Sequence, residues 1–285
     1  MEYITLNNET KIPVAGIGTF RLSPEEAENS TKWALTNGYE LVDTANAYMN
    51  EKAVGRGIKA SGRKREDVYL VTKLWPSIYG KADQAIDDTL KRLDTDYIDL
   101  LFLHQPAGEY EAAYEAIERA VKAGKVKSIG LSNFDDNSLP KLKALVEKCE
   151  IKPAVVQVEA HPYYPQEELK KYLDTFGAKV MAWYPLGHGD KALLEENIFA
   201  RLAEKYGKTS AQIILRWHTQ VGNIVIPGSK SEAHIKDNID IFDFTLTVDE
   251  MKEIDSLNKG ERYYVSSEEA LANYVAYNPD FEAQL

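Results

Sequence analysis

The chain has 285 residues, of which 44% are hydrophobic and 28% charged, a composition typical of a globular protein with a sizeable core. Its formal net charge of −11 opposes binding to nucleic acid, and no stretch approaches the roughly 18 apolar residues that a membrane span requires. The first residues lack the pattern of a signal peptide, and the single cysteine, Cys149, excludes an internal disulfide and favours a cytoplasmic location.

Short apolar runs alternate with amphipathic segments along the whole chain. The runs, which we interpret as strands, are residues 14–19, 40–44, 68–73, 98–104, 126–133, 154–159, 178–183 and 223–229. The amphipathic segments, which we interpret as helices, are residues 23–38, 49–62, 81–96, 109–125, 138–149, 166–177 and 198–220. Eight buried strands that alternate with helices predict an α/β protein with one domain, residues 1–285, folded as a (β/α)8 TIM barrel. A hairpin at residues 2–17 is expected to plug the bottom of the barrel.

Polar residues end several of the apolar runs, at the edge where barrel enzymes assemble their sites. Asp43, Lys73 and His104 end three successive runs, where such groups are costly to bury unless they meet partners. Asp43 would keep Lys73 charged, and the ammonium would lower the pKa of the nearby Tyr48 toward a range in which it exchanges protons. With His104 donating a hydrogen bond to a substrate oxygen, the four residues suit protonation of a carbonyl oxygen.

Other strand ends offer groups that suit a flat ring bearing a carboxamide. Ser132, Asn133 and Gln157 provide hydroxyl and amide partners, and Trp183 provides an aromatic face for stacking. None of these side chains can donate a hydride, so a reduction would require a cofactor. We expect no metal site, because none of the histidines has the spacing of a metal ligand. The histidines are His104, His161, His188, His218 and His234.

The sequence resembles the aldo-keto reductases over nearly its whole length. The resemblance is carried by GIGTF at 16–20, GYELVDTANAYMNEKAVG at 38–55, TKLW at 72–75, DLLFLHQP at 99–106, KAGKVKSIGLSNF at 122–134, QVEAHPY at 157–163, AWYPLG at 182–187 and IPGSKSEAHIKDN at 226–238. It implies a monomeric barrel that binds NADPH, with NADH as the alternative, and reduces a small aldehyde or ketone.

The resemblance also implies a role for each candidate residue. The catalytic tetrad would be Asp43, Tyr48, Lys73 and His104, with Tyr48 as the general acid. The cofactor-binding positions would be Gly18, Thr19, Ser132, Asn133, Gln157, Trp183, Pro185, Leu186, Gly187, Ser229, Lys230, Ser231, His234 and Asn238. The substrate pocket would be lined by Phe20, Trp75, His104 and Tyr263.

The segment that usually binds the 2′-phosphate of NADPH departs from the common pattern of this family. A lysine directly after the proline and an arginine further on are typical, whereas this chain has Gly228 and His234 at those positions. Lys230 provides a full positive charge nearby, and a loop that leads into a helix N-terminus favours an anion. We therefore expect NADPH to be preferred over NADH.

The loop after His104 is a second departure, because residues 105–109 lead almost at once into the next helix, whereas longer family members insert a substantial loop. A short loop predicts an open and less selective pocket. The expected cover is the C-terminal tail, residues 262–285, with Tyr263 or Tyr264 over the site.

Other functions fit parts of the same pattern. A regulatory barrel that binds a nicotinamide cofactor with little turnover would share the fold, although an intact tetrad argues against it. A Schiff-base aldolase would use Lys73, but Asp43 should keep that amine protonated. A glycosidase would need two facing carboxylates, and Asp43 and Glu159 are the strand-end candidates. A Rossmann fold is disfavoured, because Arg21 stands where the third glycine of its fingerprint would be.

Overall fold

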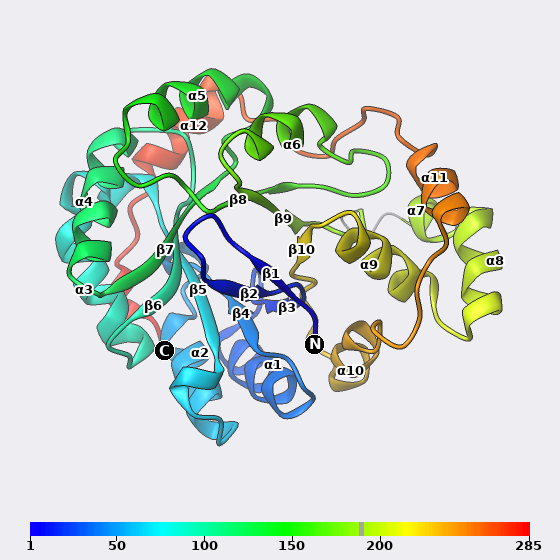
Figure 1. Ribbon diagram of the computed structural model, residues 1–285. Coiled ribbons are helices and arrows are strands. Elements are labelled where there is room, and N and C mark those ends of the chain that lie inside the picture. Colours follow the sequence, from blue (N-terminus) through cyan, green and yellow to red (C-terminus); the bar gives the residue numbers. More distant parts are fainter. Residues whose placement is uncertain (188–190) are drawn as a thin grey trace.

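A barrel of parallel strands surrounded by helices forms the centre of the molecule (Figure 1). The computed structural model describes residues 1–187 and 191–285, so His188 lies outside the described residues. Within them, eight parallel strands follow one another in chain order around the sheet. These strands are β3 (Gly16–Gly18), β4 (Leu41–Asp43), β5 (Tyr69–Leu74), β6 (Ile98–Leu103), β7 (Val126–Ser132), β8 (Val155–Glu159), β9 (Lys179–Trp183) and β10 (Ile224–Val225).

The last strand returns to the first. Parallel bridges join Ala15 to Val225 and Gly18 to Gly228. A Cβ atom added to Gly18 would lie 2.7 Å from the carbonyl oxygen of Ile226, so glycine is what allows this close approach. The predicted (β/α)8 barrel is thereby confirmed.

Helices surround the strands of the barrel, and further helices follow the last strand in the C-terminal part of the chain. They are α1 (Pro24–Thr36), α2 (Glu51–Ala60), α3 (Ala82–Leu93), α4 (Tyr110–Lys122), α5 (Leu139–Lys148), α6 (Glu167–Asp174), α7 (Lys191–Leu194), α8 (Asn197–Tyr206), α9 (Ser210–Gln220), α10 (Glu232–Ile239), α11 (Val248–Asp255) and α12 (Glu268–Ala276). No helix in the described part of the chain is long and apolar enough to cross a bilayer.

Residues 198–220, interpreted above as one amphipathic segment, form two helices instead of one. Gly207 ends α8 with a φ of 65°, a left-handed conformation that glycine adopts without strain. Thr209 then starts α9 through a reciprocal pair of hydrogen bonds with Gln212. The glycine and the capping threonine are therefore the signals that divide the segment.

The N-terminal hairpin closes the bottom of the barrel, as predicted. Its strands β1 (Tyr3–Thr5) and β2 (Lys11–Pro13) pair in antiparallel register. Leu6 and Ile12 are buried in one apolar cluster with interior residues of the barrel strands, including Leu41 and Phe102. Burial of this hairpin removes the lower end of the barrel from solvent and leaves the opposite end for a site.

The C-terminal tail packs across the opposite end. The indole nitrogen of Trp75 donates to the carbonyl oxygen of Tyr277 at 3.1 Å, just after α12. The chain end then lies beside α2 (Figure 1), where the backbone nitrogen of Glu51 donates to the side-chain oxygen of Gln284 at 2.7 Å. The expected tail over the site is thus confirmed, and it is attached at both of these points.

Candidate active site

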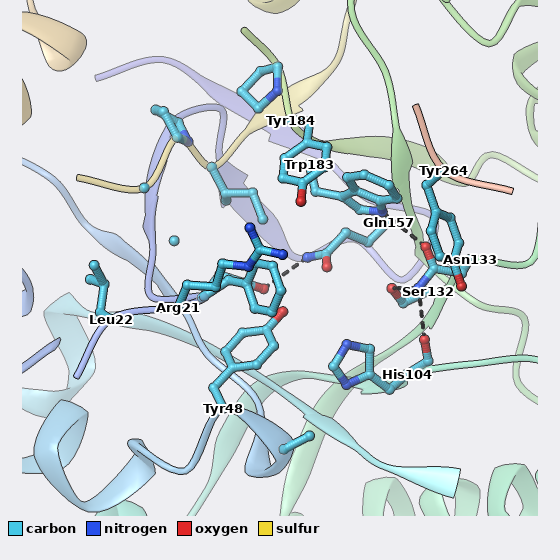
Figure 2. Close-up of a pocket in the computed structure, with 18 of the residues that line it drawn as sticks. Arg21, Leu22, Tyr48, His104, Ser132, Asn133, Gln157, Trp183, Tyr184 and Tyr264 are labelled. Carbon is cyan, nitrogen blue, oxygen red and sulfur yellow. Dashed lines mark hydrogen bonds between the residues drawn. The ribbon is translucent and has the colours of Figure 1, made fainter. Parts of the chain in front are cut away.

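A cavity of about 820 Å³ opens at the carboxyl ends of the strands (Figure 2). Of the predicted site residues, those that line it are Gly18, Phe20, Asp43, Tyr48, Trp75, His104, Ser132, Asn133, Gln157, Trp183, Pro185, Leu186, Ser229 and Lys230. Those that do not line it are Thr19, Lys73, Gly187, Ser231, His234, Asn238 and Tyr263. Lining residues that the sequence analysis did not assign to the site include Arg21, Leu22, Glu26, Tyr184, Tyr274 and Tyr277.

The charged pair at the base of the cavity is completely enclosed. Lys73 Nζ lies 2.6 Å from Asp43 Oδ2 and donates to the carbonyl oxygen of Thr44 at 2.8 Å. Burial lowers the pKa of Lys73 and raises that of Asp43, while their mutual attraction opposes both shifts. The other carboxylate oxygen of Asp43 accepts from Gln157 Nε2 at 2.8 Å, so each charge is hydrogen-bonded as well as paired.

Tyr48 lies directly above this pair, on the short 3-10 turn η1 (Asn46–Tyr48). Lys73 Nζ is 4.7 Å from the centroid of its ring. The expected lowering of the tyrosine pKa is nevertheless wrong for this structure: burial, followed by the charges of Asp43 and Tyr184, raises the pKa of Tyr48 well above its ordinary value. Tyr48 is therefore a neutral phenol that holds its proton.

His104 faces Tyr48 across the cavity, with ring centroids 5.6 Å apart (Figure 2). Burial, together with the charge of Lys73, lowers the pKa of His104 well below its ordinary value. Its Nδ1 is buried and has no hydrogen-bond partner among the residues that the structure describes. The imidazole is therefore neutral, and one of its ring nitrogens can donate to a ligand oxygen.

Four predicted ligands of a carboxamide ring lie together on the neighbouring strand ends. Asn133 Nδ2 donates to Ser132 Oγ at 3.2 Å and to the carbonyl oxygen of His104 at 3.0 Å. Trp183 Nε1 donates to Asn133 Oδ1 at 3.0 Å, which fixes the orientation of the indole. Gln157 completes this wall of the cavity through its bond to Asp43. The group presents hydroxyl, amide and aromatic surfaces on one side.

Two residues support the site from behind the lining. Thr19 Oγ1 donates to the carbonyl oxygen of Asp43 at 3.0 Å, so its hydroxyl holds the strand end and does not face the cavity. Asn50 is fully buried, and its Nδ2 donates to the carbonyl oxygen of Thr19 at 3.0 Å. Sequence analysis missed Asn50, and its position directly before a helix would have suggested a cap, whereas its side chain makes no capping hydrogen bond.

Lys230 lines the part of the cavity next to α1. Its Nζ lies 3.1 Å from Glu26 Oε1, and both residues line the cavity. Ser229 also lines it, but Ser231 acts as the N-cap of α10, accepting from the backbone nitrogen of His234. His234 is exposed and Asn238 is half-buried, and neither residue lines the cavity. The loop thus borders the cavity at Ser229 and Lys230, and sequence analysis missed the acid opposite its lysine.

The near end of the tail is held by Glu159. The backbone nitrogens of Tyr263 and Tyr264 donate to its two carboxylate oxygens at 2.6 and 2.9 Å. Tyr264 lines the cavity with its ring centroid 5.7 Å from that of Trp183, whereas Tyr263 lies outside the lining and packs on His161. Tyr264 is thus the cover, and the prediction of Tyr263 as a lining residue is not met.

These contacts weigh against two of the alternatives. Lys73 is fully buried and does not reach the cavity, so a substrate carbonyl has no access to its amine. Glu159 is occupied by the tail and His161 and does not face Asp43 across the cavity. Among the described residues there is no cluster of three groups that could hold a metal ion.

Comparison with known proteins gives consistent results. The sequence model of the Aldo/keto reductase family matches residues 14–259. The glyoxal reductase of Bacillus subtilis (strain 168) is 41% identical, over 94% of this chain and 97% of that protein. The methylglyoxal reductase DkgA of Escherichia coli (strain K12) is 37% identical, over 91% of this chain and 94% of that protein.

Solved structures agree. An aldo/keto reductase from Brucella melitensis superimposes with a TM-score of 0.85 at 40% identity, covering 90% of this chain and 99% of that one. A Bombyx mori aldo-keto reductase in complex with NADP has a TM-score of 0.85 at 32% identity, covering 92% of this chain and 94% of that one.

Proposed function

Because the chain belongs to the aldo/keto reductase family, an oxidoreductase family, we propose that it reduces small aldehydes or ketones to alcohols with NADPH, Tyr48 being the general acid. The observation that carries this proposal is the phenol of Tyr48 beside the imidazole of His104 in the lining of the cavity, with ring centroids 5.6 Å apart. We further propose that residues 1–285 act as one domain and as a cytoplasmic monomer.

The lining fits a nicotinamide cofactor. Ser132, Asn133 and Gln157 would hold the carboxamide, and Trp183 would stack on the ring. Lys230, on the same continuous cavity, would contact the 2′-phosphate. When bound, the cofactor would supply the hydride that no side chain can provide. Gly18 and Gly228, which are joined by a parallel bridge, line the same cavity without side chains.

The residues of the chain supply the proton. His104 would donate a hydrogen bond that orients the carbonyl oxygen beside Tyr48. As negative charge develops on that oxygen, the phenol of Tyr48 would transfer its proton. The ammonium of Lys73, held by Asp43, would then stabilise the phenolate that remains. The dicarbonyls glyoxal and methylglyoxal, named for two relatives, are the first substrates to test, followed by small aldehydes.

The variant Tyr48→Phe tests this assignment. It should lower turnover of NADPH with an aldehyde by about a hundredfold or more, because the proton donor is lost, while cofactor binding changes little. Steady-state NADPH oxidation measures the first quantity and quenching of tryptophan fluorescence the second. The matched variant Tyr277→Phe removes a phenol from the same cavity and should leave turnover nearly unchanged.

Two results would count against the proposal. Near-normal turnover in Tyr48→Phe would exclude this residue as the proton donor. Binding of NADPH by the unmodified protein without oxidation by any aldehyde or ketone of a broad panel would instead favour the regulatory barrel.

A further inference from the structure

We propose that Glu26 weakens the binding of NADPH and thereby limits the preference of this protein for NADPH over NADH. The inference rests on the proposed function, because it concerns the cofactor of the same site. It starts from the carboxylate of Glu26, which lines the cavity beside the one lysine in the loop at residues 227–233.

The carboxylate of Glu26 is fixed, whereas its partner is not. Glu26 Oε2 accepts from the backbone nitrogen of Ser23 at 2.9 Å, as part of the capping box that begins α1. Glu26 Oε1 is 3.1 Å from Lys230 Nζ, and the lysine side chain is 71% exposed against 34% for the glutamate. A long exposed lysine can adopt other rotamers, but the glutamate is tied to the start of the helix.

The positive charge of Lys230 is therefore largely offset by its neighbour. The lining around it includes Leu22, Glu26, Gly228 and Ser229, of which Glu26 is the acid, and Arg21 is the other cation of the lining. Figure 2 shows Leu22 across the cavity from His104, the end at which the carbonyl is expected. Glu232 occupies the first turn of the nearby α10, where its negative charge reduces the attraction of the helix N-terminus for an anion.

A 2′-phosphate and a 2′-hydroxyl would respond to this pair in opposite ways. The phosphate carries between one and two negative charges, so it must share Lys230 with Glu26 and lie near a carboxylate that cannot move away. The hydroxyl of NADH, by contrast, can donate to a carboxylate, as ribose hydroxyls do to acids in other nicotinamide sites. Glu26 thus weakens NADPH binding and favours the unphosphorylated cofactor.

Glu26→Gln removes the charge and retains the cap, because a glutamine oxygen can also accept from Ser23. NADPH should bind about threefold to tenfold more tightly, the size expected for one screened like-charge contact near a surface, and NADH should change by less than about twofold. Both dissociation constants are measured by fluorescence quenching. The fragments 2′,5′-ADP and 5′-AMP, measured by calorimetry, should show the same difference without involving the nicotinamide end.

Glu25→Gln is the matched control, since Glu25 lies in the same first turn of α1 and does not line the cavity. It should leave the ratio of the two dissociation constants unchanged. Three results would overturn this inference without affecting the proposed function. The dissociation constants for NADPH and NADH could shift equally in Glu26→Gln, neither could shift, or Glu25→Gln could show the same selective shift. If the unmodified protein bound neither cofactor, the proposed function would be wrong as well.

Discussion

Lys73 and Asp43 form an ion pair with a separation of 2.6 Å in which the two side chains are 0% and 2% exposed. Neither charge is exposed enough to be well hydrated, so each depends on the other and on the groups that bond to them. The pair supports Tyr48 from below. Removing one member should destabilise the protein, because the other charge would remain buried and unpaired.

Asp43→Asn should destabilise the protein by about 3–5 kcal/mol at neutral pH. Without the carboxylate, burial lowers the pKa of Lys73 further below its ordinary value, and the unfolded chain then binds more protons than the native state. The free energy of unfolding should consequently rise with pH between the lowered native pKa and the ordinary value near 10.5. Urea unfolding at several pH values measures this slope. A loss that does not vary with pH would contradict it.

The pH dependence of carbonyl reduction should follow the neutral forms of Tyr48 and His104. Because burial raises the pKa of Tyr48 and lowers that of His104, neither group should change its charge between about pH 6.5 and pH 9.5. The profile of kcat/KM for reduction is expected to be flat over this interval. A decline with a midpoint inside this interval would contradict the flat profile and would favour the lowered pKa of Tyr48 that the sequence alone had suggested.

Arg92 is the buried link between α3 and the tail. Its Nε lies 2.6 Å from Glu51 Oε2, and its Nη1 also contacts Glu282 at the chain end. Glu51 is fully buried and burial raises its pKa, so Arg92→Met should cost about 3–5 kcal/mol of stability. The pKa of Glu51 would then rise further. The free energy of unfolding should fall as pH rises from the pKa of Glu51 in the unfolded chain to its higher pKa in the native protein.

The exposed pair of Arg119 and Asp83 provides the control for this variant. Its side chains are 56% and 68% exposed, so Arg119→Met should leave the denaturant midpoint almost unchanged. A similar loss in both variants would indicate that the packing of the arginine side chain, and not the buried charge, is responsible.

The fold was largely predictable because local and global patterns agree. The strands of the barrel are buried on both faces, so their sequences are apolar runs that stand out from the amphipathic helices. The helices within residues 198–220 were harder to predict, because α8 and α9 are both amphipathic and follow each other closely. Gly207 and Thr209 are the signals that mark the break between them. The tail over the cavity was also expected from its aromatic residues.

The sequence indicated which strand ends contribute side chains to the site, but it did not reveal the charges and contacts of those side chains. The pKa of Tyr48 depends first on burial and then on Asp43 and Tyr184, and spacing along the chain does not reveal how these groups surround the phenol. Glu26 was not found because its contact with Lys230 joins residues 204 positions apart. Tyr264 and not Tyr263 lines the cavity because Glu159 binds the backbone of both, which fixes the direction of their side chains.

Lys230→Met should weaken NADPH binding by about tenfold, because a charge-assisted contact to the 2′-phosphate would be lost and Glu26 would face the phosphate unpaired. NADH has no phosphate at this position, so its dissociation constant should change little. Titration of tryptophan fluorescence with each cofactor measures both values. Lys236→Met, on the exposed part of α10 outside the cavity lining, is the control for a general loss of positive charge. Equal weakening of NADH and NADPH in Lys230→Met would mean that the lysine only shapes its loop, and the proposed preference for NADPH would lose its main support.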